Sequence, residues 1–163
     1  MVRSKVALML VLGTAVPALA ADPATPPPNY AAVMVGTTVG YRPPGGPWDG
    51  FQSDFSPAVG YGRYVTPTVA LELDLGPTFV KDRYASFGLV PAVVWTFSSH
   101  AYLAARFLVP LDPQTNFGLF PGVGVFQTYG RYAPYVEVNL SSYVGRGNPD
   151  FGVSVTAGVL ISF

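Results

Sequence analysis

Phe151-Gly-Val-Ser-Val-Thr-Ala-Gly-Val-Leu-Ile-Ser-Phe163 ends the chain with a regular alternation of residue types. Every second residue, beginning with Phe151 and ending with Phe163, is apolar, and the residues between them are mostly Gly, Ser and Thr. This period of two predicts one β-strand with an apolar face and a small, largely hydroxylic face. The 13 residues also exceed the about 9–11 that a tilted strand needs to cross a bilayer.

The N-terminal 20 residues have the three parts of a secretory signal peptide. Arg3 and Lys5 make a basic start, an apolar run follows, and Ala18-Leu19-Ala20 is a small-x-small cleavage site. The apolar run is too short for a transmembrane helix, so we predict that it is a cleaved signal. The predicted divisions are a signal peptide over 1–20, a proline-rich periplasmic leader over 21–29 and the folded domain over 30–163.

Composition excludes several classes of protein. The chain has no cysteine, which excludes disulfides, thiol chemistry and a lipoprotein anchor. Charged residues make up 11% of the chain, against roughly 25% in ordinary domains. No basic patch indicates nucleic-acid binding, and no run of 18 apolar residues indicates a helical membrane span. We find no phosphate-binding loop or metal-ligand spacing, so we predict no cofactor, no metal and no catalytic residue.

Seven further strand-like segments precede the C-terminal one, and breaks of two lengths separate them. Thr66-Pro67-Thr68 and Ser98-Ser99-His100 are tight turns, and 128–133 is slightly longer, whereas the alternate breaks are longer and reach their maximum at 42–54. Short turns at one rim and longer loops at the other are typical of outer-membrane barrels. The predicted strands are Tyr30–Tyr41, Phe55–Val65, Val69–Gly76, Phe87–Phe97, Ala101–Leu111, Phe117–Gln127, Pro134–Tyr143 and Phe151–Phe163.

The direction of the apolar faces distinguishes a membrane barrel from a soluble one. In the segment 69–76, Val and Leu alternate with Ala70, Glu72, Asp74 and Gly76. Eight faces of bulky side chains would overfill the narrow interior of an eight-stranded barrel, so the bulky faces must point outward, against lipid. In lipid an open sheet edge would leave backbone groups unpaired, so the sheet must close. The predicted fold is all-β, an eight-stranded antiparallel up-and-down transmembrane β-barrel.

Five polar residues fall on the predicted inward face of alternate strands. Asp74, Arg106 and Asn139 occupy equivalent positions, spaced by 32 and 33 residues. We predict that Arg106 forms a charge-assisted network with the carboxylates across the lumen and plugs it. The alternative is a catalytic pair of carboxylates or a proton path. The predicted lumen network comprises Glu72, Asp74, Arg106, Glu137 and Asn139.

Two other functions stay open at this point. The glycines that we place on the inward face predict a thin water column, and hence a narrow, porin-like channel. His100 beside Ser98 and Ser99 suggests a hydrolase that modifies lipid A, but the predicted turn lies at the periplasmic rim, away from the outer leaflet. We therefore predict that the protein is not an enzyme. The glycines assigned inward are Gly36, Gly40, Gly118, Gly122, Gly124 and Gly158.

Aromatic residues and prolines add further expectations. The segment 42–54 with its surroundings carries Trp48, Phe51 and Phe55, which predict either a partner site or rings that rest on the membrane surface. Arg63 falls on the outward face and must snorkel at a rim or mark a register shift. Proline removes a ladder hydrogen bond, so we expect bulges or strand ends at the strand prolines. These are Pro57, Pro91, Pro121 and Pro134.

Strand alternation, the segment Leu71-Glu-Leu-Asp74 and the terminal Phe163 together resemble the small eight-stranded outer-membrane barrels of the OmpA and OmpX type. The resemblance implies a bacterial outer-membrane location, contact with the bilayer and lipopolysaccharide, and escort by periplasmic chaperones. It also implies that the barrel assembly machinery reads Val159, Ile161 and Phe163. The function that we predict is a structural or surface-interaction role, with the narrow channel as the alternative.

Overall fold

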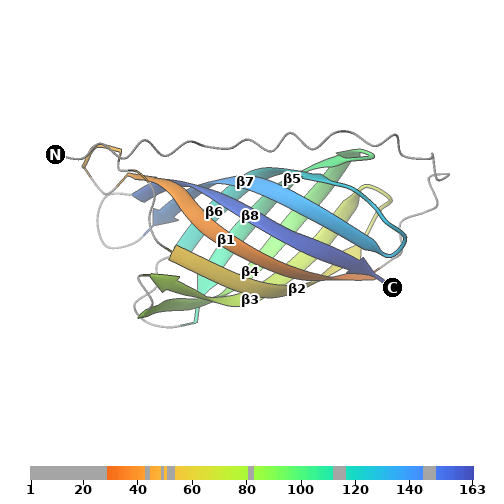
Figure 1. Ribbon diagram of the computed structural model, residues 1–163, viewed down its shortest axis with the longest axis horizontal. Coiled ribbons are helices and arrows are strands. Elements are labelled where there is room, and N and C mark those ends of the chain that lie inside the picture. The colour runs from red at the N-terminus through yellow and green to blue at the C-terminus, as the bar shows by residue number, and fades with distance from the viewer. Residues whose placement is uncertain are drawn as a thin grey trace, which may run out of the picture.

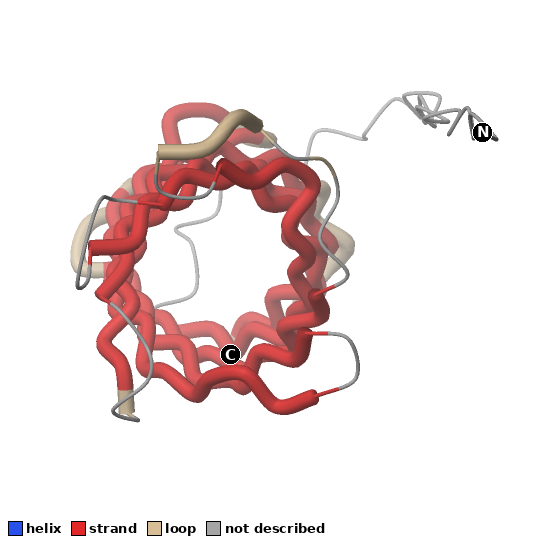
Figure 2. The backbone as a smooth tube through the Cα atoms, turned by 90° about the vertical axis from the view of Figure 1, so that its left-hand side faces the viewer, coloured by secondary structure: helices blue, strands red, loops and turns tan. Residues whose placement is uncertain are grey.

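Eight antiparallel strands form one closed barrel in the computed structural model (Figures 1 and 2). Each strand pairs with its neighbour in the sequence, and the last strand pairs with the first. The all-β, eight-stranded, up-and-down fold predicted from the sequence is therefore confirmed. The strands are β1 (Asn29–Arg42), β2 (Asp54–Tyr64), β3 (Val69–Val80), β4 (Arg83–Ser98), β5 (Ala101–Pro110), β6 (Phe117–Phe126), β7 (Tyr132–Val144) and β8 (Asp150–Ser162).

The structure describes residues 29–42, 45–48, 50, 54–80, 83–111, 117–144 and 150–163. The predicted signal peptide and all but the last residue of the predicted leader lie outside this part of the chain. In the described ranges there is no helix of the length and apolar character that a membrane crossing requires.

The two ends of the barrel differ in their connections. At the end that holds both Asn29 and Phe163, which we call the terminal rim, the strands are joined by 65–68, 99–100 and 127–131. Phe163 N–H donates to the Asn29 carbonyl there, at 3.0 Å. The opposite end is the loop rim, where most connections are longer, as predicted. The β3–β4 connection is the exception, because β3 continues to Val80 and β4 already begins at Arg83.

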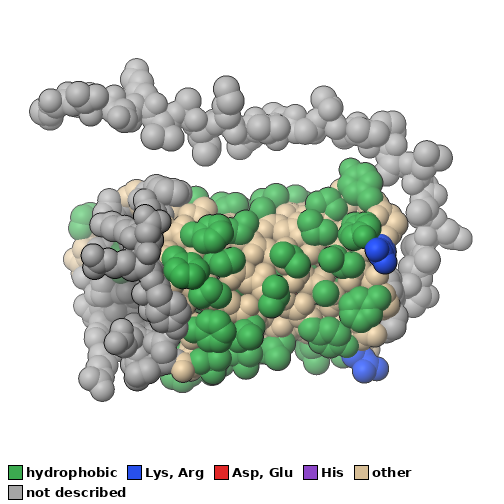
Figure 3. Space-filling model, turned by 60° about the horizontal axis from the view of Figure 1, so that its bottom comes forward, with side chains coloured by type: hydrophobic (Ala, Val, Ile, Leu, Met, Phe, Trp, Pro, Cys, Tyr) green, Lys and Arg blue, Asp and Glu red, His purple; other side chains and the backbone are tan. Residues whose placement is uncertain are grey.

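The outer surface of the barrel is apolar and the inner surface is small or polar. On β3, Leu71 and Leu73 are 52% and 45% exposed, whereas Ala70 and Glu72 are 0% and 6% exposed. Figure 3 shows hydrophobic side chains over the middle of one face, with the visible Lys and Arg side chains at the end that holds the C-terminus. The alternation in the sequence thus corresponds to an apolar exterior, in the sense that we predicted.

Tyrosine rings fill the lumen near the terminal rim. Tyr30, Tyr102 and Tyr135 are buried. The Tyr102 ring packs edge-on against Tyr135, with centroids 6.3 Å apart. Each tyrosine is paired across the strands with a glycine, and a Cβ on that glycine would overlap the tyrosine ring. The tyrosine–glycine pairs are Tyr30–Gly62, Tyr102–Gly124 and Tyr135–Gly158.

A bulge in β1 changes the face of one predicted lumen glycine. The pairing of β1 with β8 shifts between Thr38 and Gly40, so that Gly40 pairs with the outward-facing Val153. Paired residues share a face of the sheet, and the prediction that Gly40 lines the lumen is therefore wrong. A Cβ on Gly40 would lie 3.9 Å from Cζ3 of Trp48, so this ring rests against the outer wall.

Three strand prolines lie in regular pairing and not at bulges, contrary to our expectation. β4 pairs with β5 at Leu89–Val109 and again at Ala92–Arg106, and the register is the same at both places. Between them Pro91 makes no ladder pair with β5. Proline has no N–H to donate, so the ladder is interrupted on one side of the strand without a shift. Similar interruptions surround Pro57 on the β3 side and Pro121 on the β7 side.

The bulges lie elsewhere, and a second proline lies opposite Pro57. Register shifts occur in three strand pairs. The β1–β8 pairing shifts between Thr38 and Gly40, the β3–β4 pairing shifts between Thr78 and Phe79, and the β4–β5 pairing shifts between Thr96 and Ser98. Pro77 pairs with β4 and, in the register of β2 with β3, lies opposite Pro57. Neither proline has an N–H to donate, so both hydrogen bonds between them are missing, and Pro77 stays in the sheet through its pairing with Phe87 on β4. Pro134 lies near the start of β7, as predicted.

The tyrosine–glycine pairs predict different responses to the same substitution. Gly124→Ala places a methyl group in the Tyr102 ring and should lower the free energy of unfolding by about 1–3 kcal/mol. Gly36→Ala is the matched control, because the nearest atom to its Cβ would be Thr156 Oγ1, at 3.2 Å, and no ring lies within 4 Å. Urea titration of the folded barrel in detergent measures both. Equal losses would contradict close packing of the tyrosine against glycine.

Candidate functional site

Arg106, on the inward face of β5, joins carboxylates from two other strands. Its Nε and Nη2 donate to the two carboxylate oxygens of Glu137 on β7, at 2.9 and 3.0 Å. Its Nη1 donates to Asp74 Oδ2 at 3.0 Å and to Glu72 Oε1, both on β3. All four residues are at most 8% exposed. The structure therefore places one guanidinium across the lumen, held on two sides.

Neighbouring groups position the acids. The Tyr30 hydroxyl donates to Glu72 Oε2 at 2.8 Å, which links the network to the tyrosine layer. Asp74 pairs with Gly60, and a Cβ on that glycine would overlap the aspartate carboxylate. Glycine opposite a large polar side chain thus gives that side chain the space to cross a narrow lumen.

Asn139 borders the network on β7. It is 4% exposed, and its Oδ1, like Oδ1 of Asp74, has no hydrogen-bond partner among the described residues. All five predicted network residues therefore lie inward, and four of them share direct hydrogen bonds with Arg106 at the centre. Among the described residues, no cluster of His, Cys, Asp or Glu has an arrangement that could hold a metal ion.

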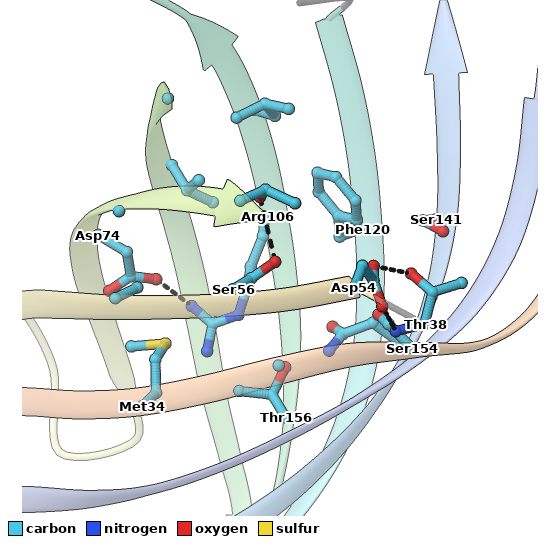
Figure 4. A pocket seen from close by; sticks show the side chains of 18 of the residues that line it. Met34, Thr38, Asp54, Ser56, Asp74, Arg106, Phe120, Ser141, Ser154 and Thr156 are labelled. Carbon is cyan, nitrogen blue, oxygen red and sulfur yellow. Dashed lines mark hydrogen bonds and ion pairs between the residues drawn. The ribbon is translucent and has the colours of Figure 1, made fainter. Parts of the chain in front are cut away.

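A cavity of about 400 Å³ lies between this network and the loop rim (Figure 4). Asp74, Arg106 and Asn139 line it on the network side, and Asp54 lines it near the loop rim. Apolar groups, among them Leu108, complete the wall. The Ser and Thr residues that line the cavity are Thr37, Thr38, Ser56, Thr78, Ser86, Ser141, Ser154 and Thr156.

Asp54 holds the β1 bulge at the mouth of this cavity. Its Oδ1 accepts from the Thr38 N–H at 2.6 Å and from Thr37 Oγ1 at 3.1 Å, and its Oδ2 accepts from Thr38 Oγ1 at 2.6 Å. Figure 4 shows Asp54 and Thr38 turned toward one another. Sequence reasoning placed Asp54 in a loop and missed it, although an acid just before a predicted strand was a visible signal.

His100 lies with Ser98 and Ser99 in the exposed turn at the terminal rim. Ser99 Oγ is 2.7 Å from His100 Nδ1, and Ser98 Oγ accepts from the His100 backbone N–H at 3.2 Å. No carboxylate in the described part of the chain is hydrogen-bonded to His100. The structure therefore brings two of the three groups of a hydrolytic triad together in this turn and leaves the acid out.

The residues of the predicted C-terminal assembly signal lie on the outer face of β8. Val159 and Ile161 are partly exposed, and Phe163 is 64% exposed with its ring 6.5 Å from that of Tyr61. Recognition of these residues by the assembly machinery stays a prediction.

The structure separates the aromatic residues of the predicted loop site. Trp48 rests against the outer face of β1, and Phe55 points outward from β2 beside Phe79. Phe51 lies outside the described residues. Arg63 is outward and exposed one residue before the end of β2, and neither pairing of β2 shifts register there. Of our two expectations for Arg63, the position at a rim is therefore the one that fits.

Comparisons with known proteins support the fold alone. No family model matches the sequence, and no curated protein sequence is significantly similar. Among solved structures, the chain resembles Neisserial surface protein A, at 11% identity and a TM-score of 0.55 over 83% of this chain and 97% of that one. It also resembles a barrel from the de novo design of transmembrane β-barrels, at 14% identity and a TM-score of 0.51, over 83% and 95%.

Removal of the guanidinium tests the network. Arg106→Leu leaves three buried carboxylates without their shared cation and should cost about 3–5 kcal/mol of unfolding free energy. Asp74→Asn and Glu137→Gln in the same chain should recover part of this loss. Phe107→Leu, an outward change at the next residue, is the control. The melting temperatures of the variants in detergent are compared. An unchanged melting temperature in Arg106→Leu would show that the network does not stabilise the barrel.

Proposed function

We propose that the protein is an integral outer-membrane β-barrel with a closed lumen and a structural or surface-interaction role. The observation that carries this proposal is the distribution of side chains on the wall. Large apolar residues stand on the outside, and ionisable groups in the middle of the described strands point inward. An apolar exterior around a closed sheet is stable in hydrocarbon, where each backbone group must be paired within the wall.

Aromatic and basic residues near the terminal rim support a position across the bilayer. Tyr61 and Phe163 form a ring pair on the outer wall, and the Arg131 guanidinium stacks 5.0 Å from the Tyr132 ring centroid. Such groups favour the level of the lipid headgroups. In this orientation the terminal rim faces the periplasm and the loop rim faces outward, toward lipopolysaccharide.

Two layers of side chains support a closed lumen. The tyrosine layer fills the half next to the terminal rim, and the Arg106 network crosses the middle. Gly124 and Gly158, which suggested a water column, lie beneath tyrosine rings, and Gly122 lies beneath Asn139. The observation that favours the alternative, a narrow channel, is the cavity of about 400 Å³ on the loop side.

Planar-bilayer recordings separate the closed barrel from the channel. We expect no stable single-channel steps from the natural protein. Tyr102→Gly combined with Tyr135→Gly should produce steps, or at least raise conductance, because it removes part of the tyrosine layer. Heat-modifiable migration on detergent gels shows that both proteins are folded. Stable steps from the natural protein would favour the channel.

The position across the bilayer is tested with arginine on the outer wall. Val138 is 43% exposed and pairs with Val123 and Val155 in the middle of β7 and β8. Val138→Arg should lower the unfolding free energy in lipid vesicles by about 2–4 kcal/mol. Val125→Arg, next to the terminal rim, should cost about 0–1 kcal/mol. If both substitutions had small and equal effects on the unfolding free energy, the outer wall would face water and not lipid.

A further inference from the structure

The cavity between the Arg106 network and the loop rim has the size of a small-molecule site. Its volume of about 400 Å³ falls within the roughly 300–1,000 Å³ of ligand pockets. Side chains from β1 to β8 line it, so its wall is built on strands and its shape is fixed by the sheet. The tyrosine layer and the network close the end opposite the loop rim.

The charges around this cavity favour a cation. Arg106 is the only cation among the described residues that line it, and its guanidinium is already directed at the three network carboxylates. Asp54 adds a fourth carboxylate near the mouth. Of these four carboxylates, Asp54 and Asp74 line the cavity, and together with Arg106 they give its wall a formal charge of −1, which favours cations over anions.

The hydrogen-bonding groups favour a ligand that donates. Asp54 accepts three hydrogen bonds from Thr37 and Thr38, and two carboxylate oxygens together offer about four acceptor sites. The Ser and Thr residues along the wall add hydroxyl oxygens, which accept as well as donate hydrogen bonds. An ammonium group has three donors and no acceptor, so it suits this surplus of acceptors.

The remaining wall fits a short apolar chain. Met34, Val90, Leu108 and Phe120 line the cavity together with the hydroxyl groups. We propose that the cavity binds a small organic cation, an ammonium group on a short apolar chain. This inference rests on the closed lumen proposed above, because an open channel would let such a ligand pass.

Nuclear magnetic resonance of the isotope-labelled barrel in detergent micelles tests the site, with n-butylammonium chloride as the probe. We expect saturable shifts at amides around the cavity, such as those of Gly36, Ser86 and Ser154. Butanol and butyrate have similar chains without the positive charge and should give no saturable shift there. Equal responses to butylammonium and butanol, or to butylammonium and sodium chloride, would overturn the proposal.

Substitutions within the cavity give a second criterion. Ser154→Phe fills the cavity and should abolish saturation, whereas Val155→Phe, the adjacent residue on the outer face, should leave it unchanged. Asp54→Asn keeps an acceptor for the Thr38 N–H but removes the charge, and it should weaken binding by roughly tenfold or more.

Gel migration before and after boiling shows that each variant is folded. Unchanged affinity in both Ser154→Phe and Asp54→Asn would overturn the site. Bilayer conductance measured on the same preparation judges the closed lumen separately, so the failure of one proposal is distinguishable from the failure of the other.

Discussion

Closure of an eight-stranded sheet is the constraint on which the other features of this protein depend. Because β8 pairs with β1, the wall satisfies its own backbone groups and leaves no edge. The same closure fixes a lumen just wide enough for side chains. Every inward residue therefore has to fit its neighbours across the strands, whereas outward residues meet only the surroundings of the barrel.

Cross-strand complementarity is how the chain meets this constraint. Tyr102 lies over Gly124, Asp74 lies over Gly60, and in both pairs the glycine leaves space that no other residue would leave. At these positions a large side chain on one strand faces a glycine on the next. Buried charges also meet across this lumen, because Arg106 reaches carboxylates on both β3 and β7.

The sequence predicts what depends on local periodicity and leaves out what depends on contacts between strands. Alternation along Val69–Gly76 was enough to assign Glu72 and Asp74 inward, and the repeat spacing aligned Arg106 with them. The bulge that turns Gly40 outward depends on Asp54, a residue of another strand, through its bond to the Thr38 N–H. The tyrosine layer needed cross-strand register, which periodicity within one strand does not contain.

The filling of the lumen is asymmetric along the barrel axis, and this asymmetry bears on function. Rings and charge-assisted hydrogen bonds occupy the terminal half, and the loop half keeps a cavity with hydroxyl and carboxylate groups. A uniform channel would need small residues along the whole axis. A purely structural barrel would need no polar cavity, because side chains could fill both halves. A lumen filled at one end and hollow at the other fits the small-molecule site that we propose, which a ligand would enter from the loop side.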